Sequence, residues 1–323
     1  MKHTLNIFLI IIISVAVFIL SLCFGSSHYS LNTVAMSLFQ TDLTIHSHQV
    51  LYEIRFPRVM ASLCAGAMLS ISGLILQTTT HNNLSDSSIL GINAGANLSI
   101  VIATLIIPSI SFLNILIFGF VGGLMIGLIV LLITRSQSSL HLILAGAGIS
   151  LFIYAITDFV IITNDLGQYI AFFTAGGASG QRLSNYTIIL PLFIIVFVIL
   201  QILSKELDIF LHGDEMSISL GQNTKFIKII AVICAIILAS IAVAMVGNVV
   251  FIGLLVPHIT KMLYGYKHCY NLILTGILGG TLFMLCDMFS RIFNEIPVNA
   301  IIAVIGLPIF ILIIRRRESA YED

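Results

Sequence analysis

Charged residues are scarce in this sequence, and their scarcity excludes a water-soluble protein. Of the 323 residues, 9% are charged and 59% are hydrophobic, whereas a soluble globular chain carries roughly 25% charged residues. A bilayer accommodates so much apolar surface, but a soluble fold does not. The 14 basic and 14 acidic residues balance, so no overall charge favours nucleic acid or an acidic substrate. The sequence predicts an integral membrane protein that contacts lipid and has no nucleic-acid partner.

Motifs for metal binding and hydrolysis are also lacking. The five cysteines form no CxxC pair, so we interpret them as small hydrophobic residues. There is no GxxxxGK[ST] phosphate loop and no Gly-Lys pair, so the chain does not hydrolyse ATP by that route. HExxH is absent as well, and His46 and His48 supply only two of the ligands that a metal site needs. We therefore expect a chain that is not itself an enzyme, with no cofactor and no metal site.

Long apolar runs, separated by short polar stretches, fill most of the chain. A span needs about 20 mostly apolar residues to cross a hydrocarbon core roughly 30 Å thick. The runs predict an all-α integral membrane protein of about ten transmembrane helices, in a single domain over residues 1–323. Small residues inside the runs, such as Gly66 and Gly73, predict closely packed helices. The predicted spans are residues 5–24, 59–77, 89–108, 112–134, 141–162, 187–204, 227–246, 249–264, 271–290 and 297–314.

Basic residues lie unevenly between these predicted spans. With the N-terminus in the cytoplasm, ten of the 14 basic residues fall on the inner side and four on the outer side. Because cytoplasmic loops carry an excess of Lys and Arg, this orientation is favoured and both termini are predicted to be cytoplasmic. The four outer residues are Arg55, Arg58, Arg182 and Arg291.

One inner polar stretch, residues 205–226, is long enough to be more than a turn. Its segment LDIFLHGDEMSISLGQNT, residues 207–224, is amphipathic and carries Asp208, Asp214 and Glu215 before a Leu220-Gly221 stop. A short helix with this pattern can lie on the inner surface and dock into a groove on a partner. On these residues alone, a solvated loop between two spans is the favoured interpretation.

Several segments together resemble a known family. The motifs resemble those of the permeases of bacterial ABC importers for iron siderophores, haem and cobalamin, the FecCD-type family, and they extend over residues 55–317. They are RFPR (55–58), GAMLSISGLILQ (66–77), HNNLSDSSILGINAGA (81–96), HGDEMSISLG (212–221), GNVVFIGLLVPHITKMLYG (247–265), DMFSR (287–291) and EIPVNAIIAVIGLPIF (295–310).

The resemblance implies a ten-helix subunit with the ABC importer type II permease fold, in the cytoplasmic membrane of a bacterium. Such a subunit pairs with a second permease, identical or homologous, above two ATPase subunits. An extracytoplasmic binding protein delivers the substrate. An iron–siderophore complex is the expected substrate, with haem and cobalamin as alternatives within the same family.

Site residues follow from the same resemblance. Arg55, Arg58 and Arg291 match positions that receive acidic residues of the binding protein. The alternative for Arg291 is a local pair with Asp287, four residues earlier on one helix. The residues that match the segment coupled to the ATPase are Asp214, Glu215, Leu220 and Gly221. There the acids would orient or cap a short helix, and Gly221 would permit the turn that ends it.

Asp158 is the acidic residue predicted to lie within a span, where a charge costs on the order of 3 kcal/mol unless it is paired or protonated. We place it on the translocation path or against a helix partner. A secondary transporter that uses Asp158 as a proton or ion site is therefore a second hypothesis, and it would need no ATPase partner. A membrane-embedded enzyme is a third hypothesis, but the sequence shows no assembled catalytic set for it.

Overall fold

The computed structural model describes residues 2–88, 90–107, 110–133, 139–167, 176–211 and 213–319, and within these ranges the regular structure is helical, with no strand. A π-helical turn, Val50–Arg55, leads directly into α4, and a short 3-10 turn, Leu183–Asn185, leads into α9. The α-helices are α1 (Lys2–Cys23), α2 (Leu31–Phe39), α3 (His46–Gln49), α4 (Phe56–Thr79), α5 (Ile92–Ile106), α6 (Phe112–Ile133), α7 (Ser139–Thr163), α9 (Tyr186–Ile202), α10 (Ser204–Phe210), α11 (Asp214–Ser219), α12 (Thr224–Val246), α13 (Ile252–Tyr264), α14 (His268–Ile292) and α15 (Val298–Ser319).

Every predicted apolar run coincides with one of these helices, but not every helix is long enough to cross a membrane alone. Three apolar stretches are shorter: Ile7–Cys23, Ile92–Ile106 and Val298–Pro308. The first and the last belong to the 22-residue helices α1 and α15. A 15-residue helix such as α5 rises about 22 Å, less than the roughly 30 Å of a hydrocarbon core. In the described part of the chain, six stretches are long and apolar enough to cross: His46–Thr79, Phe112–Ile133, Leu144–Thr163, Leu183–Ile202, Thr224–Val246 and His268–Ile292.

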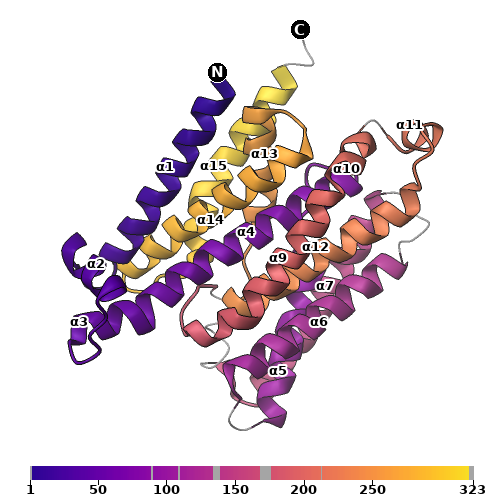
Figure 1. Cartoon of the computed structure of the whole chain (residues 1–323). Helices are drawn as coiled ribbons and strands as arrows, with labels where there is room; N and C mark the ends of the chain where they lie inside the picture. The colour runs from indigo at the N-terminus through magenta and orange to yellow at the C-terminus, as the bar shows by residue number, and fades with distance from the viewer. Residues whose placement is uncertain are drawn as a thin grey trace.

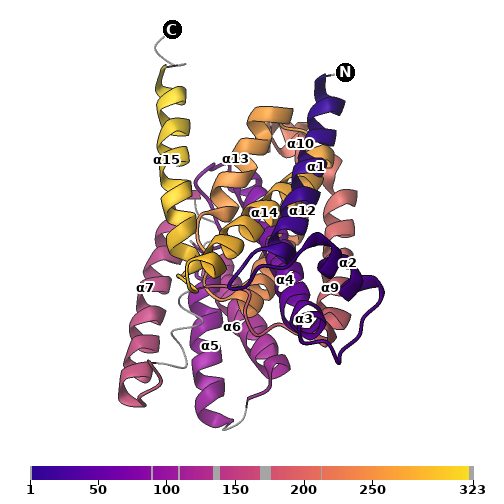
Figure 2. The same ribbon diagram turned by 90° about the vertical axis from the view of Figure 1, so that its left-hand side faces the viewer.

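The helices form one bundle with both chain termini at the same end (Figures 1 and 2). We call this the terminal end; it also holds α10, α11 and the start of α14. The opposite end holds α2, α3 and the start of α4. α4 runs through the bundle and packs against α12, α13 and α14, whereas α7 lies at the edge of the molecule in Figure 2.

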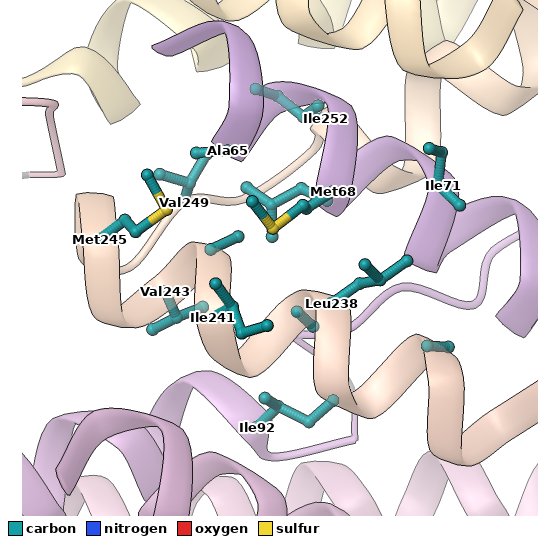
Figure 3. Close-up of a cluster of buried hydrophobic side chains, with 14 of the residues drawn as sticks. Ala65, Met68, Ile71, Ile92, Leu238, Ile241, Val243, Met245, Val249 and Ile252 are labelled. Atoms are coloured by element: carbon teal, nitrogen blue, oxygen red, sulfur yellow. The ribbon is translucent and has the colours of Figure 1, made fainter. Parts of the chain in front are cut away.

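The core forms where α4 faces α12. Met68 and Leu238 are 0% exposed. Figure 3 shows side chains of both helices pointing toward one another, together with Val249 from the link to α13 and Ile252 from the first turn of α13. Glycines allow the close approach around this core. A Cβ at Gly73 would lie 1.9 Å from the carbonyl oxygen of Gly253, so the predicted close packing at this position is confirmed.

Candidate functional sites at the two ends of α14

The three arginines that the sequence assigns to docking come together at the opposite end of the bundle. Arg55, Arg58 and Arg291 are 5%, 8% and 4% exposed, so their side chains lie inside the protein. They form an arginine cluster with Asp287 and Glu295. The sequence assigned these residues to docking, and the structure adds intramolecular partners for each.

Arg58 on α4 binds both carboxylates of the arginine cluster. Its Nε lies 3.1 Å from each oxygen of Asp287, and its Nη1 and Nη2 lie 2.8 and 2.7 Å from the two oxygens of Glu295. Asp287 also pairs with Arg291, at 3.3 Å across one helical turn of α14, so the alternative local pair is present. The hydrogen bonds from Arg58 hold the pKa of Glu295 below its usual range, although partial burial opposes this shift.

Arg55 and Arg291 bind the last turn of α1. Nη1 of Arg55 donates to the carbonyl oxygens of Leu22 and Cys23 at 2.9 and 3.2 Å, and Nη2 of Arg291 donates to that of Ser21 at 3.0 Å. The last carbonyl groups of a helix have no intrahelical donor, and cationic side chains stabilise them. The arginine cluster therefore ties together the ends of α1, α4 and α14.

The arginine cluster is not electrically balanced. Three guanidinium groups meet two carboxylates, which leaves one positive charge. Nη1 of Arg291 is buried without a hydrogen-bond partner in the part of the chain that the structure describes. It lies beside Gly25, where a Cβ would come within 3.3 Å of this atom and 3.1 Å of Nη2 of Arg55. One further anionic group would satisfy both the charge and the donor.

At the terminal end, α14 begins with a second set of polar contacts. Oδ1 of Asp208, on α10, accepts a hydrogen bond from the backbone N–H of His268 at 2.7 Å and lies 2.8 Å from its Nδ1. Nε2 of His268 lies 2.8 Å from Oγ1 of Thr78 on α4. Partial burial raises the pKa of Asp208, but the hydrogen bonds from His268 outweigh it and hold this pKa below its usual range.

The predicted coupling stretch folds into α10 and α11, so it is helical rather than an extended loop. Asp214 is the first residue of α11, Leu220 follows the last, and Gly221 has a φ of 81°, as the predicted turn requires. Leu220 is 62% exposed. The side chains of Asp214 and Glu215 lie outside what the structure describes. Ser217 ties the two helices together, since its Oγ donates to the carbonyl oxygen of Ile209 at 3.3 Å.

Asp158 forms no ion pair with the described residues of either site. It lies on α7 with an exposed side chain, and its neighbours Leu151, Phe152, Phe159 and Ile162 are each more than two-thirds exposed. This face of α7 therefore has no cover from the described part of its own chain.

Sequence reasoning missed two partners in these sites. It assigned no role to Glu295, the second carboxylate on Arg58, or to His268, which links Asp208 to Thr78. Glu295 carries a faint signal as an acid between an outer arginine and the next apolar run. His268 carries none, because its partners are 60 and 190 residues away. Among the described residues, no three His, Cys, Asp or Glu side chains gather as a metal site would require.

A long apolar bundle with buried ion pairs at one end and short surface helices at the other defines a multi-pass membrane subunit. The chain belongs to the FecCD transport family, whose model matches residues 10–316. Members of this family are permease subunits of ABC importers, which are transport components.

Curated relatives cover most of the chain. The iron(3+)-hydroxamate import system permease FhuB of Bacillus subtilis is 31% identical over 306 residues, covering 93% of this chain and 80% of that protein. The Fe(3+) dicitrate transport system permease FecD of Escherichia coli is 31% identical over 280 residues, covering 84% of this chain and 87% of that protein.

Solved structures agree with the fold. A structure described as an inward-facing conformation of a metal-chelate type ABC transporter superposes with a TM-score of 0.80 at 25% identity, covering 96% of this chain and 98% of that one. PsaBC from Streptococcus pneumoniae superposes with a TM-score of 0.60 at 15% identity, and this likeness supports the fold alone.

Proposed function

We propose that this chain is the permease subunit of an ABC importer that moves an iron–siderophore complex across the cytoplasmic membrane. The observation that carries the proposal is the family match over residues 10–316. Relatives named for iron(3+)-hydroxamate and Fe(3+) dicitrate import support an iron chelate as the substrate. Haem and cobalamin are the alternatives within the family. The chelate already satisfies its metal, so the permease needs no metal ligands of its own.

ATP hydrolysis belongs, in this proposal, to two partner ATPase subunits that bind at the terminal end. The sequence holds no phosphate loop of its own. Around α11, Met216, Ile218 and Leu220 are 53%, 60% and 62% exposed, which gives a short helix an apolar face that fits a groove on a partner. Leu220 and Gly221, with Asp214 and Glu215, form the coupling surface. The terminal end then faces the cytoplasm, in agreement with the excess of basic residues predicted on that side.

A second permease, identical or homologous, covers the exposed face of α7. A carboxylate in contact with lipid costs on the order of 3 kcal/mol at the centre of a span, so the exposed position of Asp158 favours a cover of protein or of water in the translocation path. The remaining apolar helices, α1, α5, α13 and α15, complete about ten crossings with the six long stretches.

The arginine cluster receives the extracytoplasmic binding protein. Its surplus positive charge and the unpaired Nη1 of Arg291 support docking of an incoming carboxylate, because charged pairs across an interface fix its orientation. Arg55 and Arg58 contribute charge from within the bundle. Arg291→Lys should weaken binding while retaining the charge, because lysine cannot reproduce the guanidinium geometry. The exposed outer residue Arg182 gives the matched control: Arg182→Lys should leave binding unchanged, and equal binding by both variants would contradict the docking role.

Reconstitution tests the proposed function. The chain is placed in proteoliposomes with its ATPase and binding-protein partners, and uptake of radiolabelled iron(III) hydroxamate, haem and cobalamin is compared. We expect hydroxamate uptake that requires ATP and persists without a proton gradient. Uptake that needs the gradient and not ATP would favour the secondary transporter, with Asp158 as its ion site. Uptake of haem or cobalamin alone would retain the ABC importer but change the substrate.

A further inference from the structure

The contacts of α10 suggest how the coupling surface acts on the rest of the bundle, and this inference rests on the proposed function. α10 directly precedes α11, and Asp208 on α10 is joined to the first residue of α14 by two contacts of 2.7 and 2.8 Å. The imidazole of His268 then reaches Thr78 on α4 at 2.8 Å. Three helices thus meet through one chain of hydrogen bonds, which we call the Asp208–His268–Thr78 chain.

Two further contacts hold α10 against the bundle. Phe210 is 1% exposed, and its ring stacks on that of His81 with centroids 5.3 Å apart. Leu207 is fully buried. α10 therefore packs as part of the bundle, whereas α11, joined to it through Ser217, exposes its apolar face. α11 also contacts α12, so a force applied to α11 reaches both α12 and α10, and through α10 it reaches whatever α10 holds.

The side-chain types of the Asp208–His268–Thr78 chain match a nucleophile, base and acid set, but the burial of Thr78 and His268 excludes a hydrolytic role. Thr78 and His268 are 2% and 1% exposed. The Thr78 hydroxyl also lies 3.0 Å from the carbonyl oxygen of Leu74 in its own helix, so no substrate can reach it. Such a buried, polar and directional contact serves to fix positions.

We propose that Asp208 is a positioning residue that transmits movement of the coupling surface to α4 and α14 through His268 and Thr78. α4 and α14 are also joined at the opposite end, where Arg58 pairs with Asp287. The two helices are thus linked near both of their ends, and displacement at the terminal end moves them together. Loss of the Asp208–His268–Thr78 chain leaves the ATPase able to bind and turn over, but reduces the transport obtained from each ATP.

The test compares transport with ATP consumption in the assembled importer. Uptake of radiolabelled iron(III) hydroxamate and release of phosphate are measured in the same proteoliposomes for wild type, Asp208→Ala, Asp208→Asn, Thr78→Val and Thr78→Ser. Asn retains an oxygen that can accept from His268, and Ser retains the hydroxyl. Asp208→Asn and Thr78→Ser should therefore keep part of the uptake per ATP that the other two variants lose. We expect Asp208→Ala and Thr78→Val to lower the uptake per ATP by about two- to thirtyfold, with ATP hydrolysis retained.

The matched control is Ser70→Ala. Oγ of Ser70 donates to the carbonyl oxygen of Thr275 at 2.8 Å, so it also joins α4 to α14 through a buried hydrogen bond but does not contact α10. Its uptake per ATP should equal that of wild type. The inference is overturned if this ratio is unchanged in both Asp208→Ala and Thr78→Val, or if uptake and hydrolysis fall in parallel. If Asp208→Ala does not fold, Thr78→Val decides. Wild type that takes up no hydroxamate with ATP would instead contradict the proposed function.

Discussion

α4 and α7 are both long apolar helices, yet they meet very different surroundings. The protein buries 89% of the residues in the apolar stretch that contains α4, but only 22% of those in the apolar stretch of α7. α4 buries polar side chains that bond to neighbouring helices, such as Ser72 to the carbonyl oxygen of Ala235 at 2.8 Å. α7 exposes a carboxylate, Asp158. Apolar composition therefore indicates that a helix suits a membrane, but not whether protein or lipid surrounds it.

The largest expected effect tests the ion pairs that α4 makes. Asp287→Ala leaves Arg58 and Arg291 without their shared, fully buried carboxylate, and breaking one partner of such a buried pair costs about 3–5 kcal/mol. The temperature at which the buried thiols Cys64 and Cys234 react with a dye measures this loss. Glu295→Gln is the control: it removes a half-exposed partner of Arg58 and should lower that temperature much less. Equal shifts in the two variants would contradict the account.

The next largest effect concerns glycines, whose surroundings differ between α4 and α7. Gly73→Ala places a Cβ 1.9 Å from a backbone oxygen of α13, and overpacking of this kind costs typically about 1–3 kcal/mol. The control is Gly148→Ala in α7, where no atom lies within 4 Å. It should stabilise the helix by about 0.5–1 kcal/mol. We expect the temperature of thiol reaction to fall for Gly73→Ala and to rise for Gly148→Ala. A shift in the same direction for both variants would mean that the two environments are alike.

Asp158→Leu tests what surrounds the exposed face of α7. If Asp158, five residues before the end of α7, faced lipid, leucine would stabilise the protein by up to about 3 kcal/mol, the value for the centre of a span. With a second permease or a water-filled path over this face, we expect a gain below about 1 kcal/mol and reduced chelate uptake, because the polar group is already accommodated. Ile194→Leu, at an exposed apolar position of α9, should change neither property. Thermal unfolding and uptake are measured for both variants.

The smallest effect is the pH dependence of Glu295. Because Arg58 lowers its pKa in the folded protein, this carboxylate contributes stability above its unfolded pKa of about 4.3. That contribution is lost as the pH falls through the lower folded value. Thermal unfolding followed by circular dichroism should therefore differ between wild type and Glu295→Gln at about pH 6, by less than about 1 kcal/mol because the pair is half exposed. The difference should shrink as the pH falls below about 4.3; a constant difference would contradict this pairing.

Much of the fold follows from local sequence. Each apolar run forms a helix, the Leu220-Gly221 stop ends α11, and Gly73 brings α4 against α13. These features depend on a few neighbouring residues or on one missing side chain. The number of crossings does not follow, because α5 and α13, with 15 and 13 residues, are shorter than their apolar runs.

The sites were less predictable because they depend on distant contacts. Sequence alone grouped Arg55, Arg58 and Arg291 on one side, but their burial follows from partners 33, 229 and 270 residues away. Nothing local at His268 indicates that it contacts Asp208. Pattern reasoning therefore found which residues carry charge at each end, and the three-dimensional packing was needed to find which groups satisfy them.

Labelling from outside the cell tests most directly whether the bundle crosses the membrane with its coupling surface inside. Single cysteines replace two exposed residues, Arg182 at the opposite end and Lys225 at the start of α12, in a chain whose exposed Cys269 is serine. A membrane-impermeant thiol reagent should label residue 182 in intact cells, and residue 225 only after the membrane is permeabilised. Labelling of residue 225, but not residue 182, in intact cells would contradict the account.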